Sequence, residues 1–346
     1  MSPLAILILS DGRPGHYHLA EGVAAAIARR RPVEVTKLAI ERRKSAPGRL
    51  MAGALRLGLS GATVLRTGYG LDVGQLPPAR LVISAGGDTL AANVAAARHL
   101  GASNVYCGTL KHVPVGAVSL VISSYARHAR LPHHLVALKP SGFDPDSLGE
   151  RTRAGSRRLD RPPDLAGLLV GGPSGLFQWR DDEWARLADF LRTSHIALGT
   201  RWIVSTSRRT PDPVADRLQR LQSEADGPIA DLIDFRVSGP GTLPGLFKRV
   251  DAVLATEDSS TMLSEAVCAR LPVVGVSPAS HDFKDEEREY RRLLETENWL
   301  RTLPLAALTP ETYLDALSHI QPLAENHLDR LAQALAERLP DLFVAN

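Results

Sequence analysis

Short, unbroken apolar runs alternate along the chain with longer segments whose apolar residues recur every three or four positions. The runs have the length of strands, and their lack of alternation indicates strands that are buried on both faces of a sheet. The longer segments have the spacing of helices that cover such a sheet. The pattern predicts an α/β protein with parallel strands. The predicted strands are residues 5–9, 33–38, 81–84, 105–107, 120–123, 135–138, 165–170, 202–205, 235–237, 252–255 and 273–276.

A polar stretch divides this pattern into two halves. Residues 144–163 are rich in Arg, Pro and Gly, which is the composition of a linker. We expect a first domain at residues 1–150, a linker at 151–163 and a second domain at 164–308. Residues 309–346 have helical spacing, and we expect these C-terminal helices to pack back on the first domain. The expected architecture is two Rossmann-like, doubly wound domains that face a central cleft.

Composition narrows the class of ligand and the compartment. The net charge of +3 and the pI of about 9.0 suit phosphate-bearing ligands or an anionic membrane surface. No basic motif points to nucleic acid, so we expect none as a partner. Cys107 and Cys268 are the only cysteines, which indicates a reducing compartment. The apolar run at residues 4–9 is too short for a membrane span, and no basic region precedes it, so we expect no signal peptide.

We therefore expect a cytoplasmic protein and leave open a peripheral association with the inner face of the membrane. Residues 42–66 mix Arg and Lys with Leu, Met and Val. This segment has two interpretations, an amphipathic helix at the membrane interface or a core helix with a basic outer face.

Five polar loops directly follow predicted strands. In open parallel sheets, ligands bind outside the carboxyl ends of the strands. All five loops stand at such ends, and together they favour a ligand-binding cleft. The loops are residues 10–16, 85–89, 171–175, 206–210 and 256–261.

The last of these loops has the strongest ligand chemistry. Ser259 and Ser260 stand at the start of a predicted helix, where unpaired backbone N–H groups favour an anion. The carboxylates of Glu257, Asp258 and Glu265 are suited to ribose hydroxyls. We take these residues as candidates for binding a nucleotide-linked donor. The alternative is an ordinary helix that Asp258 or Ser259 caps.

Two other loops add candidate phosphate ligands. Gly172 and Ser174 belong to a Gly-rich loop whose backbone can approach a ligand closely, although such a loop is also a common tight turn. Ser207, Arg208 and Arg209 follow a strand and offer a hydroxyl and two guanidiniums, which match phosphate oxygens. An exposed surface loop is the alternative for these three residues.

Two residues of the first half are candidates for catalysis. His16 follows the first loop and could act as a general base, or it could be a surface or capping residue. Asp88 either caps a helix or lies in the cleft. His16 and His18 lack the spacing of a helical metal site, so we expect no metal and no cofactor.

Two nucleotide-binding fingerprints are absent from the sequence. No G-x-G-x-x-G follows the first strand, and no P-loop pattern occurs. These absences weaken the case for a dinucleotide oxidoreductase, a P-loop NTPase and a nucleotide-sugar epimerase or reductase.

The motifs SDGRPGH, LVISAGGDT, GGPSG, TSRRTP and TEDSSTMLSEA, in this order, resemble those of the mitochondrial-fission Elm-type family. Members are regarded as glycosyltransferases of GT-B fold. More distantly, the chain is similar to the GT-B enzymes that move GlcNAc from UDP-GlcNAc to lipid I. The similarity rests on Gly15-His16, on Ser264-Glu265 and on Leu271-Pro272, and it implies that Glu265 holds the donor ribose.

The resemblance implies a GT-B-like glycosyltransferase that works without a metal. The second half would bind a UDP- or GDP-sugar, and the first half would bind the acceptor, with a membrane lipid as one candidate. Helix N-termini, hydroxyls and Arg208 or Arg209 would stabilise the leaving diphosphate. The alternative is a non-catalytic scaffold or interaction protein of the same fold, linked to membrane or organelle division. Fold alone does not separate the two.

Overall fold

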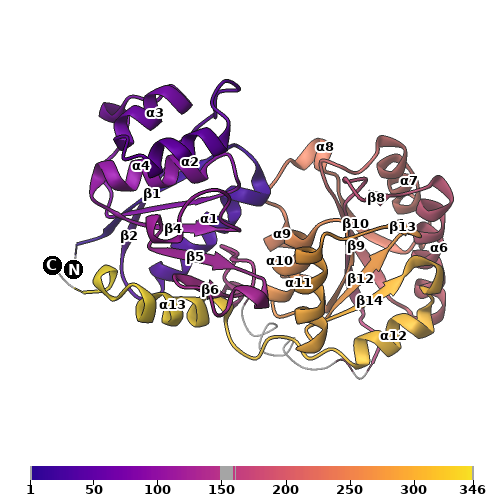
Figure 1. Ribbon diagram of the computed structural model, residues 1–346. Coiled ribbons are helices and arrows are strands. Elements are labelled where there is room, and N and C mark those ends of the chain that lie inside the picture. Colours follow the sequence, from indigo (N-terminus) through magenta and orange to yellow (C-terminus); the bar gives the residue numbers. More distant parts are fainter. Residues whose placement is uncertain (1, 149–158, 160, 345–346) are drawn as a thin grey trace. The chain divides into compact units, whose positions relative to one another are not determined.

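The computed structural model describes residues 2–148, 159 and 161–344. The chain forms two compact units. Unit 1 comprises Met1–Gly142 and His327–Asn346, and unit 2 comprises Phe143–Asn326. Each unit contains a six-stranded parallel sheet with flanking helices, which confirms the predicted α/β class (Figure 1).

In the sheet of unit 1, the first strand along the chain is not an edge strand but has a neighbour on each side. Strand β1 pairs with β2 on one side and with β3 on the other. The chain therefore goes from β1 to β2 on one side and then crosses back to β3 on the opposite side of β1. The carboxyl ends of β1 and β3 therefore flank the crevice where doubly wound sheets bind ligands. The strands in spatial order are β2 (Val33–Ala39), β1 (Leu4–Ser10), β3 (Leu81–Ala85), β4 (Ser103–Cys107), β5 (Leu120–Ser123) and β6 (His134–Val136).

Alternate residues of β1 pack on the two faces of this sheet. Ile6 and Ile8 belong to a core that contains residues of α1 (Pro14–Ala28) and α13 (His327–Arg338). Leu7 and Leu9 belong to a second core, and the helices that complete it are α2 (Gly48–Arg56), α3 (Gly61–Tyr69) and α4 (Leu90–Leu100). Each fully buried aliphatic side chain contributes about 1.5–3 kcal/mol, so both layers hold the strand ends in place.

The sheet of unit 2 has the strand order 3-2-1-4-5-6 of nucleotide-binding Rossmann sheets. Its crevice lies between the first strand, β7, and the fourth, β11. The strands in spatial order are β10 (Ile229–Ile233), β9 (Arg201–Thr206), β7 (Leu165–Val170), β11 (Ala252–Thr256), β12 (Val273–Ser277) and β14 (Leu300–Pro304). A small antiparallel pair, β8 (Phe177–Gln178) with β13 (Ser280–His281), lies outside this sheet.

Helices cover both faces of this second sheet. Trp184, Trp202 and Tyr313 pack in a core under three helices, α6 (Asp181–Leu198), α7 (Asp212–Gln222) and α12 (Pro310–Ser318). On the other face Gly167 of β7 lies against Leu246 of α9 (Leu243–Phe247). The other helices against this sheet are α10 (Ser260–Cys268), which contacts β11 and β12, and α11 (Asp285–Thr296), which contacts β14.

Several elements differ from the sequence expectations. Residues 235–237, predicted as a strand, lie in helix α8 (Phe235–Ser238), because the Asp234 carboxylate accepts a hydrogen bond from the N–H of Arg236 and caps a helical turn. Strand β14 was not predicted from the sequence, because Arg301 and Thr302 interrupt its apolar run.

The unit boundaries also differ from those expected. Helix α12 packs against α6 of unit 2, and of the C-terminal helices only α13 lies against α1 of unit 1. Most of the expected linker, residues 151–158 and 160, lies outside the described residues. Residues 42–66 include α2 and most of α3, and these helices bury apolar faces against α4 and expose several cations. In the described part of the chain, no helix is both long enough and apolar enough to cross a membrane.

Candidate functional site

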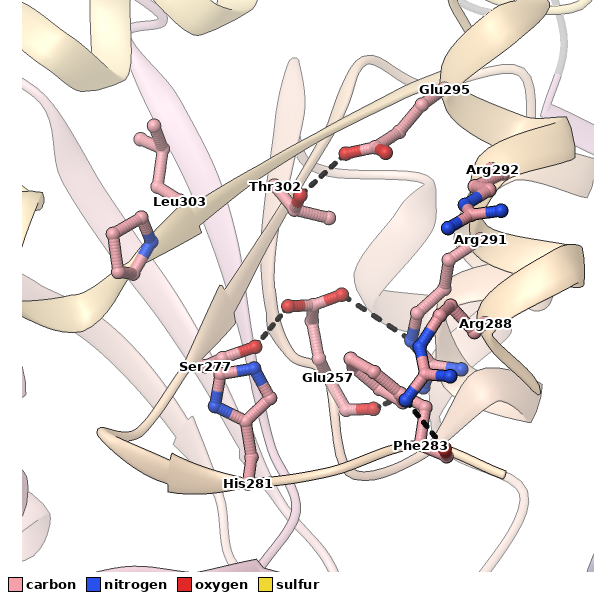
Figure 2. A pocket seen from close by; sticks show the side chains of 11 residues that line it. Glu257, Ser277, His281, Phe283, Arg288, Arg291, Arg292, Glu295, Thr302 and Leu303 are labelled. Carbon is pink, nitrogen blue, oxygen red and sulfur yellow. Dashed lines mark hydrogen bonds and ion pairs between the residues drawn. The ribbon is translucent and has the colours of Figure 1, made fainter. Parts of the chain in front are cut away.

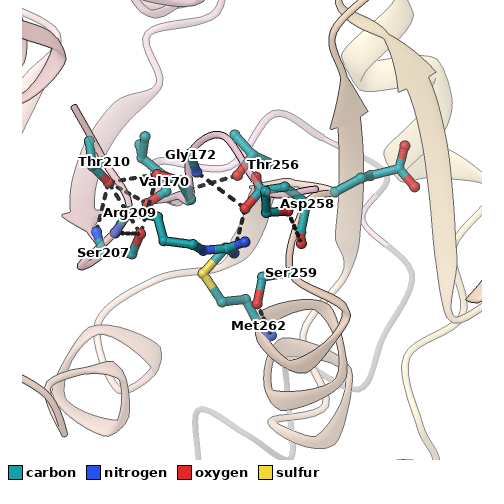
Figure 3. Close-up of polar contacts among 12 residues, drawn as sticks. Val170, Gly172, Ser207, Arg209, Thr210, Thr256, Asp258, Ser259 and Met262 are labelled. Atoms are coloured by element: carbon teal, nitrogen blue, oxygen red, sulfur yellow. Dashed lines mark hydrogen bonds and ion pairs between the residues drawn. The ribbon is translucent and has the colours of Figure 1, made fainter. Parts of the chain in front are cut away.

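Three polar loops of unit 2 meet at the crevice of its sheet. The loops follow β9, β7 and β11, which are neighbours in the sheet, and each begins where its strand ends. Figure 3 shows the side chains of these loops in contact around Gly172 and Asp258. The structure thus brings together candidates from residues 171–175, 206–210 and 256–261, with the exception of Glu257.

Hydrogen bonds join the loop after β7 to the loop after β11. The N–H of Gly171 donates to Oγ1 of Thr256 at 2.8 Å, and the N–H of Gly172 donates to Oδ2 of Asp258 at 3.1 Å. The hydroxyl of Ser174 donates to the carbonyl of Asp258 at 3.4 Å. The two glycine N–H groups that the sequence offered to a phosphate are therefore already engaged within the protein.

Gly171 and Gly172 are needed for a steric reason. A Cβ at Gly171 would collide with the Asp258 carboxylate, and a Cβ at Gly172 would collide with the backbone carbonyl of Arg209. Only residues without a side chain allow the three loops to approach this closely. Gly172 thus contributes close packing of the loops and not a free donor.

A buried ion pair lies at the centre of the cluster. Nη2 of Arg209 lies 2.6 Å from Oδ2 of Asp258, whose side chain is fully buried. Burial raises the pKa of Asp258, and the nearby Arg209 guanidinium opposes that shift. The other oxygen, Oδ1, has no hydrogen-bond partner among the described residues. Arg208, next in sequence, is exposed and makes no ion pair with any described side chain.

The loop after β9 is held by its own hydroxyls. The N–H of Ser207 donates to Oγ1 of Thr210 at 2.8 Å, and the Ser207 hydroxyl donates to the carbonyl of Gly171 at 3.2 Å. The Thr210 hydroxyl reaches the same carbonyl at 2.7 Å. These bonds fix the backbone that carries Arg208 and Arg209, so their positions do not depend on a ligand.

Helix α10 begins directly beyond Asp258. Ser259 is its N-cap, and its Oγ accepts a hydrogen bond from the N–H of Met262 at 3.4 Å. Ser260 is the first helical residue, and the N–H of Thr261 lies in a turn where no carbonyl of the same helix can reach it. Glu265 lies half-buried one turn further on. This helix end offers partial positive charge to an anion.

Glu257 lies apart from this cluster. Its buried carboxylate accepts a hydrogen bond from the hydroxyl of Ser277 and lies 3.3 Å from Nε of Arg291 (Figure 2). The adjacent residue, Asp258, points toward Gly172 instead. The sequence analysis grouped the two carboxylates as donor ligands, but the structure directs them to two different places.

In unit 1, His16 is paired with a carboxylate. Its Nδ1 lies 2.8 Å from Oδ2 of Asp11, which is buried, whereas the His16 side chain is 31% exposed. Both residues follow β1, and the ring of His16 packs against Gly86 after β3, where any Cβ would collide with it. With the Nδ1 proton directed at Asp11, Nε2 becomes the basic nitrogen.

Asp11 is the site residue that the sequence analysis missed. It lies five positions before His16 in the same loop, and this proximity of an acid to a histidine was the available signal. Asp88 does not cap a helix, because α4 has Thr89 as its N-cap and no side-chain cap bond. Instead its carboxylate binds Arg42 at 2.9 Å and lies 3.6 Å from Arg13.

No three His, Cys, Asp or Glu side chains among the described residues gather as metal ligands would.

The family to which the chain belongs follows from its sequence. The model of the family described as mitochondrial fission ELM1 matches residues 14–339. The chain belongs to this ELM1 family. No curated protein matches it in sequence.

Solved structures similar to this ELM1-family chain share its fold at low identity. MurG of Acinetobacter baumannii is 11% identical with a TM-score of 0.54, and the match covers 98% of this chain and 100% of MurG. The UDP-GlcNAc 2-epimerase of Methanocaldococcus jannaschii is 12% identical with a TM-score of 0.54, covering 97% and 100%. The UDP-GlcNAc 2-epimerase of Neisseria meningitidis, solved bound to UDP-GlcNAc, is 10% identical with a TM-score of 0.52, covering 98% and 100%. These likenesses show the GT-B fold.

Proposed function

We propose that this ELM1-family chain is a glycosyltransferase whose unit 2 binds a nucleotide sugar at the crevice between β7 and β11. The observation that carries the proposal is the convergence of three polar loops and the N-terminus of α10 on that crevice. Ligands of doubly wound sheets bind at this position. The Neisseria epimerase of the same fold was solved with UDP-GlcNAc, which makes UDP the first nucleotide to test.

Each group has a role in holding the donor. The first turn of α10 and the Arg208 guanidinium supply positive charge for the diphosphate. The Glu265 carboxylate accepts hydrogen bonds from the ribose hydroxyls. Arg209 neutralises Asp258, so that a buried negative charge does not repel the phosphates. This arrangement requires no metal ion.

His16 supplies the base for transfer. Its Nε2 takes the proton from the acceptor hydroxyl while the acceptor oxygen forms a bond to the anomeric carbon of the sugar. The bond between that carbon and the diphosphate breaks, and the electron pair leaves on the diphosphate. Asp11 holds the imidazole in the required tautomer and stabilises the imidazolium that forms.

An epimerase is a second candidate, because UDP-GlcNAc 2-epimerases share the fold. The missing dinucleotide fingerprint weakens this class, whereas the likeness in fold covers 97% of the chain. The two functions separate in one measurement. An epimerase converts the UDP-sugar into its 2-epimer with no acceptor, whereas a transferase releases UDP.

We further propose that unit 1 approaches a lipid acceptor through α2 and the loop after it. Leu50, Leu57 and Leu59 are exposed there, and Leu57 is 84% exposed. Arg49 and Arg56, both exposed, stand beside them. Leucines that can enter the acyl boundary, next to cations that attract anionic headgroups, are typical of interfacial segments.

Calorimetry with UDP, GDP, ADP and CMP tests the proposal. We expect at least one nucleoside diphosphate to bind with sub-millimolar affinity and its sugar conjugate to bind as well. If none binds at millimolar concentration, the glycosyltransferase assignment fails and the non-catalytic scaffold of GT-B fold replaces it.

A further inference from the structure

Unit 2 contains a cavity of about 300 Å³ beside helix α11, on the side of the sheet to which Glu257 points. Figure 2 shows Arg288, Arg291 and Arg292 on the helix and Leu303 on β14 across from them. This volume is at the lower end of the range for small-molecule sites, so it suits one small ligand. The cavity has no part in the donor site proposed above.

The three arginines make one wall of the cavity rich in guanidinium groups, and two of the three are paired with carboxylates. Arg291 is 7% exposed and pairs with Glu257 and Glu287, and its face lies over the Phe283 ring. Arg288 pairs with Asp282 and Asp285 at the rim. Arg292 makes no ion pair with any described side chain.

Arg288 and Arg292 are four residues apart on α11, so their like charges face the same side and repel. A bound anion would relieve this repulsion. Nε of Arg291 lies 3.3 Å from the Glu257 carboxylate, so this guanidinium is committed to the protein, whereas Arg292 has no carboxylate partner among the described side chains.

The floor of the cavity offers acceptors. Glu257 accepts a hydrogen bond from Ser277, and Glu295 accepts one from Thr302. A carboxylate has about four acceptor positions, so both retain capacity for ligand hydroxyls. Leu303 and Pro304 give an apolar patch on the opposite wall, of the kind that packs against the carbon face of a sugar ring.

We propose that this cavity binds a small sugar phosphate. Arg292 and Arg288 hold the phosphate, Glu295 and Glu257 accept hydrogen bonds from the sugar hydroxyls, and Arg291 positions Glu257. The bound sugar phosphate acts as a regulator or as a substrate. It binds independently of the nucleotide crevice, because none of the groups around Asp258 lines the cavity.

Calorimetry with glucose 1-phosphate, inorganic phosphate and glucose tests the proposal on the full chain. We expect glucose 1-phosphate to bind at least tenfold more tightly than either part alone. Arg292→Gln should weaken its binding about tenfold or more, because a charge-assisted hydrogen bond is lost. Arg201→Gln, an exposed arginine at the start of β9, is the control and should leave binding unchanged. Thermal unfolding of both variants establishes that they fold.

The outcomes separate this site from the nucleotide crevice. Glucose 1-phosphate should bind equally well in the presence of saturating UDP, and in Arg208→Ala. Displacement by UDP would place the probe in the crevice and overturn the proposal. Equal affinity for inorganic phosphate and the sugar phosphate would overturn it too, as would no binding at millimolar concentration. A failure of UDP, GDP, ADP and CMP alike to bind would contradict the proposed function and leave this test intact.

Discussion

Arg209 donates to the fully buried carboxylate of Asp258 across 2.6 Å, so a guanidinium that the sequence offers to a diphosphate already holds an anion of the protein. The pair joins the loop after β9 to the loop after β11 over Gly172. The two neighbouring arginines therefore differ, because Arg208 is exposed and Arg209 is committed to the fold.

Arg208→Ala and Arg209→Ala should accordingly differ in their effects. Arg208→Ala should weaken UDP binding and make it less sensitive to salt, while the free energy of unfolding stays unchanged. Arg209→Ala should lower that free energy by about 1–3 kcal/mol, because Asp258 loses its partner. Denaturant unfolding and calorimetry measure the two quantities. An Arg209→Ala variant that unfolds like the parent would show that the pair contributes nothing to stability.

Glu265→Ala should weaken UDP binding by about 1.5–3 kcal/mol, because charged hydrogen bonds to the ribose are lost. Inorganic pyrophosphate has no ribose, so its affinity should not change. Glu297→Ala, an exposed glutamate of the same unit, serves as the control. Equal losses for UDP and pyrophosphate would exclude ribose recognition by Glu265.

His16→Ala should reduce the release of UDP from a UDP-sugar by about 10²–10⁴-fold, which is the usual contribution of a general base. Its affinity for UDP should stay the same, because a general base acts on the acceptor hydroxyl and not on the nucleotide. Asp11→Asn should lower the rate as well, because the imidazole loses its orienting carboxylate. His99→Ala, an exposed histidine of unit 1, is the control. Full activity of His16→Ala would remove the residue from the mechanism.

The double variant Leu50→Ser/Leu57→Ser should sediment less with vesicles that contain anionic lipid, because apolar area that enters the interface is lost. Ile196→Ser is the matched control, since Ile196 in unit 2 is 83% exposed and Leu57 is 84% exposed. Vesicles of neutral lipid should bind more weakly than anionic ones. Equal effects of the double variant and the control would show that this surface does not contact lipid.

Glu257 should give stability a pH dependence with a definite sign. Burial raises the pKa of Glu257, so the folded state binds more protons than the unfolded state between the ordinary value of about 4.3 and the raised pKa. The stability of the parent relative to Glu257→Gln should therefore fall as pH rises through that window. Urea unfolding of both proteins from pH 4 upward measures the difference. A difference that grows with pH would mean that Arg291 outweighs burial.

The sequence predicted the fold well where apolar runs were long and failed where they were short or interrupted. The run at residues 252–255 predicted β11, but Phe235 and Val237 are too few to outweigh the Asp234 cap. The five loops were located because strand ends are visible in the sequence. The partners within them were not, because Arg209 and Asp258 are 49 positions apart and meet only through the sheet order. The cavity beside α11 was not predicted either, because β14 forms part of its wall. The polar residues of β14 prevented its prediction as a strand.

Helix α13 has a consequence for how the chain must be synthesised. Leu328, Leu331 and Leu335 complete the core around Ile6 and Ile8, so unit 1 is built from two segments that lie on either side of unit 2 in the sequence. All of unit 2 leaves the ribosome before the last layer of unit 1 is available. A nascent chain must keep the apolar surface of α1 from aggregating throughout that interval. A stop codon shortly before residue 327 would therefore damage unit 1, which would lack its last helix, more than unit 2, which would be almost complete.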